Sequence, residues 1–349
     1  MKRELDDSLV LKQRQTTKEI MRDQKVILLI LIVAIAVVVG LINNRFFAVK
    51  NLVSIFQAIA VGGVLTMSMA MLLLSGGLDL SIGNIMILAG CTMSMLLTGG
   101  GQTASYAPDS AITGEEAISG GLASLPLAVM AGFGVAIGCG ALNGFIVSKS
   151  KCMPLIITLG MSNVYYGLAL LMTGGQFLSF NLSFEALRVL KIAEVIPVTL
   201  IIFIGLVFVA WLLINRTKYG RRIVAIGGNE ENARLSGIKV DKYKILTYTI
   251  SGVFCGIASI LYASRLDSIT AGGGNGYELT ALSAAIIGGV TFDGGKGSVI
   301  GAFLGMVFMG LVANAMNILN IDSYVQISIN GVIVVVAVII SNLDNLRRK

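Results

Sequence analysis

Residues 26–42 have the sequence VILLILIVAIAVVVGLI, without one charged side chain. A run of this length and polarity is typical of a membrane-spanning helix, which needs about 20 mostly apolar residues. The preceding segment, 1–25, is polar and contains seven lysine and arginine residues, and no small-residue cleavage site follows the run closely. We therefore expect a cytoplasmic tail over 1–25 and a retained span, rather than a cleaved signal peptide.

Nine further apolar runs follow the first. They cover about 52–74, 81–98, 122–147, 153–173, 195–214, 245–264, 278–292, 298–318 and 324–342. The sequence thus predicts an all-α polytopic membrane protein with about ten transmembrane helices, a transmembrane domain over 26–342 and both termini cytoplasmic. The run at 278–292 is short for a full crossing. Two alternatives remain for this run. Either it forms a tilted or broken helix, or the chain has nine spans, which would place the C-terminus outside.

The composition of the whole chain agrees with a membrane protein. Of its 349 residues, 55% are hydrophobic and 13% are charged, against about 25% charged in soluble domains. So few charges would not cover a soluble protein of this length, and the chain is too apolar for disorder. The sequence contains no histidine, which excludes histidine triads, metal sites and proton relays. The four cysteines, Cys91, Cys139, Cys152 and Cys255, are expected as small hydrophobes.

Positive charge sets the expected orientation. With ten spans and an inner N-terminus, the inner segments are 1–25, 75–80, 148–152, 215–244, 293–297 and 343–349. They hold 21 of the 26 lysine and arginine residues. This asymmetry follows the positive-inside rule, and it predicts a cytoplasmic tail over 343–349. The net charge of +7 is then explained by topology and requires no nucleic-acid partner.

Motifs for catalysis are absent from the sequence. It contains no G-x-S-x-G nucleophile motif, and its Gly294–Ser298 stretch (GGKGS) only superficially matches the phosphate-binding loop, because glycine follows the lysine. Asp79 and Glu278 fall near span ends, so the midspan regions lack the acid that a proton-coupled carrier usually needs. We expect neither enzymatic activity nor a cofactor or metal in this chain.

The inner loop 215–244 is the largest inner loop and the most basic. Within it, residues 227–238 have the sequence GGNEENARLSGI. Asn229 suits a helix N-cap, the two glutamates that follow it suit the first turn, and Gly237 suits a left-handed stop. The loop therefore predicts one short surface helix of about two turns. Such a helix, on a membrane protein without an ATP site, indicates docking to a separate soluble motor.

This loop resembles the coupling motif G-G-N-x-x-A-A-R-L-S-G-I of ABC importer permeases for monosaccharides, the ribose, xylose and galactose class. Asn232 departs from it, standing where the family usually has alanine. Residues 75–83 resemble the family's S-G-G-I-D-L-S-V-G, and residues 156–162 resemble its I-V-T-L-G-M. Residues 277–301 resemble its Y-E-L-x-A-I-A-A block and the glycine-rich turn that follows. The resemblance covers about residues 50–342.

The resemblance implies a permease subunit of the cytoplasmic (inner) membrane. It would pair with a second permease copy, identical or different, dock on cytoplasmic ABC ATPase subunits and receive sugar from an extracytoplasmic binding protein. ATP would be hydrolysed on the separate ATPase, and membrane lipid would surround the spans. The implied coupling residues are Asn229, Glu230, Glu231, Asn232, Ala233, Arg234, Leu235, Ser236 and Gly237. An ion-coupled secondary carrier, an assembly subunit, and an ABC permease for a nucleoside or an autoinducer-2-like ligand stay open as alternatives.

An uncharged sugar needs hydrogen-bonding groups and stacking faces along its path. The polar candidates within spans are Asn84, Asn143, Asn163, Tyr165, Tyr166, Asn314, Asn317, Gln326 and Asn330. We favour two pairs, Asn163 with Tyr166 and Asn314 with Asn317, because residues three apart share a helix face. Asn275 and Tyr277, near the outer surface, are candidate gate or docking groups. The alternative for each residue is an interhelical hydrogen bond.

Overall fold

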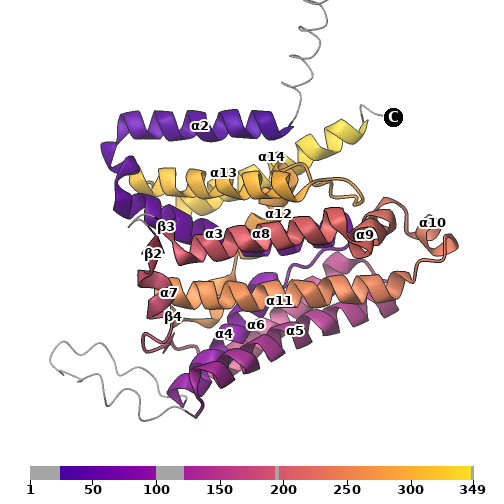
Figure 1. Ribbon diagram of the computed structural model, residues 1–349, viewed down its shortest axis with the longest axis horizontal. Helices are drawn as coiled ribbons and strands as arrows, with labels where there is room; N and C mark the ends of the chain where they lie inside the picture. Colours follow the sequence, from indigo (N-terminus) through magenta and orange to yellow (C-terminus); the bar gives the residue numbers. More distant parts are fainter. Residues whose placement is uncertain (1–23, 100–121, 193–195, 347–349) are drawn as a thin grey trace, which may run out of the picture.

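The computed structural model describes residues 24–99, 122–192 and 196–346, so nearly all of the predicted tail 1–25 and part of 343–349 lie outside it. Within these ranges, ten apolar helices follow the ten predicted runs in order. They are α2 (Gln24–Ile42), α3 (Val49–Leu74), α4 (Ile82–Thr98), α5 (Leu125–Ser150), α6 (Pro154–Thr173), α8 (Val198–Arg216), α11 (Val240–Leu266), α12 (Tyr277–Ile287), α13 (Val299–Ile318) and α14 (Ser323–Leu346). They pack side by side in one helical bundle (Figure 1).

Seven of these helices, α2, α3, α5, α6, α8, α11 and α13, are long and apolar enough to cross a membrane. Helix α4, with 17 residues, and the apolar part of α14 are shorter. Helix α12 has 11 residues and is about 17 Å long, roughly half of a hydrocarbon core. The all-helical membrane architecture is confirmed, and the expected weak span at 278–292 is a half-length helix. Protein covers it, because Ala281 to Ile286 are buried.

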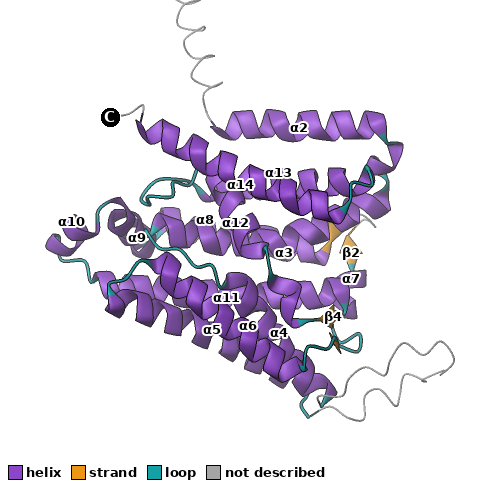
Figure 2. Cartoon of the chain, turned by 180° about the vertical axis from the view of Figure 1, so that it is seen from behind, coloured by secondary structure: helices purple, strands orange, loops and turns teal. Residues whose placement is uncertain are grey.

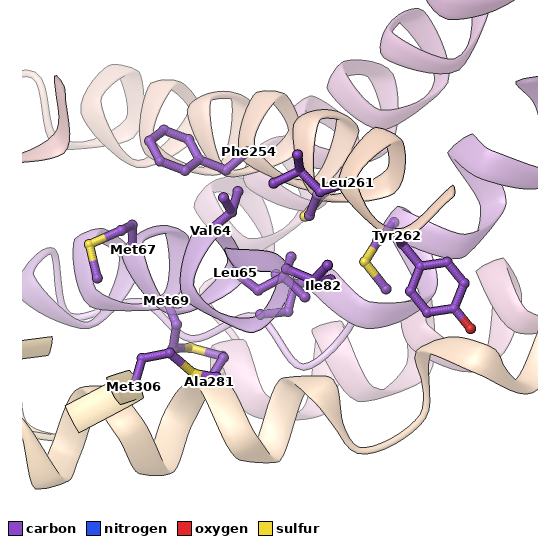
Figure 3. Close-up of a cluster of buried hydrophobic side chains, with 14 of the residues drawn as sticks. Val64, Leu65, Met67, Met69, Ile82, Phe254, Leu261, Tyr262, Ala281 and Met306 are labelled. Atoms are coloured by element: carbon purple, nitrogen blue, oxygen red, sulfur yellow. The ribbon is translucent and has the colours of Figure 1, made fainter. Parts of the chain in front are cut away.

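Helix α3 forms the centre of the bundle. In its most apolar window 89% of the residues are buried, against 17% in α2 and in α6. It packs against α8, α11, α12 and α13. Figure 3 shows Val64, Leu65, Met67 and Met69 of α3 between side chains from α11, α12 and α13. Since a membrane supplies an apolar solvent, the exposed apolar faces of peripheral helices such as α2 suit contact with lipid.

Short elements close the two ends of the bundle. At one end lie α7 (Glu185–Val189) and two antiparallel pairs of two-residue strands. The pairs are β1 (Leu178–Ser179) with β4 (Ser268–Ile269) and β2 (Lys191–Ile192) with β3 (Ile196–Pro197). The 3-10 helices are η1 (Asn44–Phe47) and η3 (Ala271–Gly274). At the opposite end, α9 (Lys218–Gly228) and α10 (Glu230–Leu235) project from the bundle (Figure 2).

The segment between α3 and α4 differs from the inner loop expected at 75–80. Of residues 75–81, Gly76 alone is exposed, and the rest are buried in an irregular segment among the helices. Its backbone needs partners there. The Tyr248 hydroxyl serves Leu78 twice, accepting from its N–H at 3.3 Å and donating to its carbonyl at 2.9 Å, and Thr158 Oγ1 accepts from Leu80 N at 3.2 Å. Helix α4 therefore starts inside the protein.

Candidate coupling site

Helix α10 has the local chemistry that the sequence predicts. The Asn229 Oδ1 accepts a hydrogen bond from Asn232 N at 2.8 Å, and Gly237 stops the helix with a φ of 79°. Glu230 and Glu231 lie in the first turn and Arg234 in the last. The predicted helix, its cap and its stop are confirmed.

Helix α9, in the same loop, is a second helix that the sequence reasoning missed. It buries Gly220, Ile223 and Ile226, and the Thr217 hydroxyl caps it by accepting from Gly220 N at 3.2 Å. Tyr219 ties it to α11 through a 2.9 Å hydrogen bond from its hydroxyl to Thr247 Oγ1. Burial raises the pKa of Tyr219 to about 12, although the hydrogen bond with Thr247 by itself lowers this pKa.

Side-chain contacts hold α10 in place and leave its end exposed. Glu230 forms ion pairs with Arg234 at 3.2 Å and with Lys244 of α11 at 2.5 Å. Ala233 is buried against Ile226 of α9 and Val240 of α11. Leu235, in contrast, is 77% exposed. An exposed leucine on a fixed, projecting helix is a suitable apolar anchor for a partner.

Four glycines join α9 to two other connections through backbone atoms. We call Gly76, Gly227, Gly294 and Gly295 the glycine junction. A Cβ placed on Gly227 would lie 2.2 Å from the Leu74 carbonyl oxygen and 2.6 Å from Gly295 N. Gly295 N also donates to the Leu74 carbonyl at 3.2 Å. The end of α3, the end of α9 and the α12–α13 connection are thus in direct backbone contact.

A buried carboxylate lies farther inside the bundle. Asp79 has no exposed surface, and its Oδ1 accepts from Ser81 N at 2.8 Å and from the Ser81 hydroxyl at 2.6 Å. Its Oδ2 accepts from Asn143 Nδ2 at 3.1 Å, and Asn143 Oδ1 accepts from the Tyr165 hydroxyl at 2.8 Å. This Asp79 network connects the 75–81 segment with α5 and α6 by hydrogen bonds alone.

Comparison with known proteins identifies the family. Residues 51–341 match the model of a family described as branched-chain amino acid transport system / permease component. The chain belongs to this family. It is a multi-pass membrane permease of an ABC import system, a transport subunit without catalytic activity of its own, and one part of a system that also uses an ATPase and a binding protein.

Three relatives match this permease over most of their lengths. Ribose import permease protein RbsC of Escherichia coli (strain K12) is 33% identical over 334 residues, 95% of this chain and 97% of the relative. The L-arabinose transport system permease protein AraH of the same organism is 32% identical, over 90% of this chain and 88% of the relative. Its D-allose transport system permease protein AlsC is 30% identical, over 90% of each. No solved structure matches the chain.

The predicted pathway residues of the permease lie on separate helices. Asn163 and Tyr166 are on α6, which packs against α4 and α5. Asn314 and Asn317 are on α13, which packs against α2, α3 and α12. The structure does not bring these two pairs together, and Figure 1 shows their helices on different sides of α3.

The two pairs also differ in their hydrogen bonds. Asn314 exchanges amide hydrogen bonds of 2.9 and 3.2 Å with Asn51 of α3, and Asn317 Oδ1 accepts from Gln326 at 3.0 Å. These are bonds of the interhelical kind left open as the alternative. Asn163 is exposed near the middle of α6, and its side-chain amide has no hydrogen-bond partner within the described residues. Tyr166 is half-buried beside it.

The remaining pair of candidates lies at the start of α12. Asn275 is exposed after η3, and Tyr277 is half-buried with its ring edge-on to Tyr262, 6.3 Å between centroids. A gate or docking role for Asn275 and Tyr277 stays a prediction.

Proposed function

We propose that this chain is the permease subunit of an ATP-driven monosaccharide importer. The observation that carries the proposal is the end-to-end similarity to permeases whose names specify ribose, L-arabinose and D-allose. All three are sugars of five or six carbons without charge. The middle parts of the transmembrane helices accordingly carry amides and hydroxyls rather than charged side chains, which suits a neutral polyhydroxy ligand.

The test is uptake by a reconstituted system. Proteoliposomes containing the permease, its ATPase and its binding protein are expected to accumulate labelled ribose, L-arabinose or D-allose only when ATP is enclosed. The same vesicles without the ATPase should not accumulate sugar. Uptake driven by an ion gradient in its absence would instead support the secondary-carrier alternative. Uptake of a nucleoside or an autoinducer-2-like ligand alone, with ATP, would keep the ABC mechanism and change the substrate.

We further propose ten crossings with both termini cytoplasmic, which places 1–25, 215–244 and 343–349 on the inner side. Residues 268–288 support an even count. They start at β4, which pairs with β1 at one end of the bundle, and continue through η3 and α12 to Gly288, beside Gly301 at the start of α13. The half-length helix and the irregular segment before it thus cross the bundle together. The distribution of 21 of 26 basic residues agrees with this orientation.

The residues Asn229 to Gly237 are proposed to dock on the ATPase, with Leu235 as the anchor. Leu235→Asp is expected to reduce ATPase binding at least tenfold, because it places a charge where an apolar side chain would be buried. The measurement is co-purification of the ATPase with the permease, together with ATP-dependent sugar uptake. Leu235→Met, which keeps the apolar volume, should retain binding. Equal ATPase recovery for the aspartate and methionine variants would disprove the assignment.

Asn163 is proposed to face the sugar pathway at a contact with a second permease copy. Its side chain is exposed at midspan, where an unpaired amide in lipid is unfavourable. Gly160 and Gly167, one turn to either side, have open space where a Cβ would be, so another helix can approach closely. Some partner is therefore needed to cover this face.

Replacing Asn163 by leucine is expected to lower the initial rate of ribose uptake about fivefold, the effect of one lost hydrogen bond of about 1 kcal/mol. Thermal stability should be unchanged, since the amide has no hydrogen-bond partner within the described residues. Val164→Leu changes the next exposed position and serves as the matched control. An uptake rate for Asn163→Leu equal to that of Val164→Leu would rule out a pathway role.

A further inference from the structure

A cationic cleft lies beside α10, between the middle of α9 and the start of α11. It has a volume of about 470 Å³, and its lining includes Arg222, Lys239, Lys242 and Tyr243. Its lining contains no acidic residue. Neither Lys239 nor Lys242 has an ion-pair partner among the residues that the structure describes. Three like charges therefore converge on one concave surface without an anion to balance them.

The acidic residues near α10 line a different cleft from Arg222, Lys239 and Lys242. The second cleft, of about 760 Å³, lies on the other side of α10 and contains Glu230, Glu231 and Asp241. These acids are accompanied by their own cations, since Glu230 pairs with Lys244 and Asp241 pairs with Lys149 at 3.1 Å. The nearby acids are thus directed away from the cationic cleft, which leaves its positive potential uncompensated.

The cationic cleft is partly pre-organised. The Arg222 guanidinium lies 5.2 Å above the centre of the Tyr243 ring and also donates to the Tyr243 hydroxyl. Arginine has five N–H donors in a planar fork, so four remain for an anionic oxygen. Cation–π stacking and the hydrogen bond fix the direction of that fork. An oriented arginine with two exposed lysines suits a phosphate group.

The cleft lies next to the ends of two membrane-spanning helices, which favours a lipid headgroup as the source of that phosphate. Arg222 follows the last residue of α8 by six positions, and Lys239 and Lys242 flank the first residues of α11. Both α8 and α11 are long and apolar enough to cross a membrane. Cations at the point where two membrane-spanning helices leave the hydrocarbon lie at the depth of the lipid headgroups. Basic pockets between helices on the cytoplasmic side are known to bind such headgroups.

We propose that Arg222, Lys239 and Lys242 form a binding site for the phosphate of an anionic phospholipid headgroup. The bound lipid would occupy the cleft beside α10, with its acyl chains along α8 and α11. The lipid would hold α9 and α11 together at the level of the coupling loop. This site is separate from sugar recognition and does not require ATP.

The test is native mass spectrometry of the purified permease with added phosphatidylglycerol, phosphatidylcholine or inorganic phosphate. Arg222→Gln, Lys239→Gln and Lys242→Gln are combined in a cleft variant. The matched control combines Lys151→Gln, Lys218→Gln and Arg221→Gln, three exposed cations of the same end that do not line the cleft. Both variants lose the same charge, so a difference between them reports a specific site.

The wild-type and control proteins are expected to retain one phosphatidylglycerol that the cleft variant loses. Each cation near a membrane surface contributes about a fivefold gain in binding, so the cleft variant should bind at least tenfold more weakly. Lys242→Gln alone should give a partial loss, which guards against misfolding of the triple variant. Equal lipid retention by the cleft variant and the control would overturn the proposal. So would equal binding of phosphatidylcholine, displacement by millimolar inorganic phosphate, or a cleft variant that loses only the ATPase.

Discussion

Asp79→Leu is expected to destabilise the permease by about 3–5 kcal/mol and to eliminate sugar uptake. The substitution keeps most of the side-chain volume and removes both carboxylate oxygens. The Ser81 N–H and the Ser81 hydroxyl would then lose their acceptor inside the protein, and the Asn143 amide would lose one of its two acceptors. Each buried donor without an acceptor is unfavourable by about 1–3 kcal/mol. The measurement is the midpoint of thermal unfolding in detergent, combined with uptake in proteoliposomes.

Two further variants calibrate this result. Asp79→Asn retains one acceptor oxygen and should lose about half as much stability. Asp241→Asn removes a carboxylate that is partly exposed and pairs with Lys149 at the surface, so it should change stability by less than about 1 kcal/mol. An unfolding midpoint of Asp79→Leu close to that of Asp241→Asn would show that the Asp79 network does not hold the 75–81 segment.

Gly227→Ala is expected to reduce ATP-dependent uptake more than tenfold while the ATPase still binds. The new Cβ would overlap the Leu74 carbonyl oxygen, which no side-chain rotation relieves, because both contacting groups are backbone. Overpacking of this kind is unfavourable by about 1–3 kcal/mol and displaces the chain. The glycine junction would open, while the docking surface around Leu235 stays intact. The measurements are uptake, ATPase co-purification and ATP hydrolysis in the same preparation.

Gly228→Ala is the matched control for this experiment. It adds the same methyl group one residue later, where the Cβ would meet no atom within 4 Å of the described chain. Its uptake should remain within about twofold of the wild-type rate, consistent with the small effects of most surface substitutions. Equal uptake by the two alanine variants would exclude transmission through the glycine junction.

The helices of the bundle could be predicted because hydropathy is a local property of the sequence. The ten apolar runs correspond to helices, and the short run at 278–292 corresponds to the half-length α12. Helix α10 was likewise predictable, because Asn229 and Gly237 act on backbone groups within a few residues of themselves. Helix α9 was missed because three glycines and three cations among its eleven residues obscure the periodicity of Tyr219, Ile223 and Ile226.

The Asp79 network could not be predicted in the same way. Its partners are far away in the chain: Asn143 is 64 residues from Asp79, and Tyr248 is 170 residues from Leu78. The sequence therefore suggested an inner loop at 75–80, because these residues fall between two apolar runs. The same limit applies to Asn314, whose hydrogen bond to Asn51 joins helices 263 positions apart. Local pattern identifies such residues as polar and does not identify their partners.

If the ATPase docks on α10 as proposed, the separation of Leu235 from the glycine junction assigns partner recognition and mechanical coupling to different residues. Side chains at the exposed end of α10 can be replaced without altering the backbone contacts of Gly227 with Leu74 and Gly295. The residues on the exposed face of α10 could therefore be exchanged. Grafting the corresponding residues of another permease there would direct this chain to a different ATPase. Under the same proposal, the coupling to α3 and to the α12–α13 connection would be unchanged, because Gly227 contacts them through main-chain atoms, which are the same for any sequence on α10.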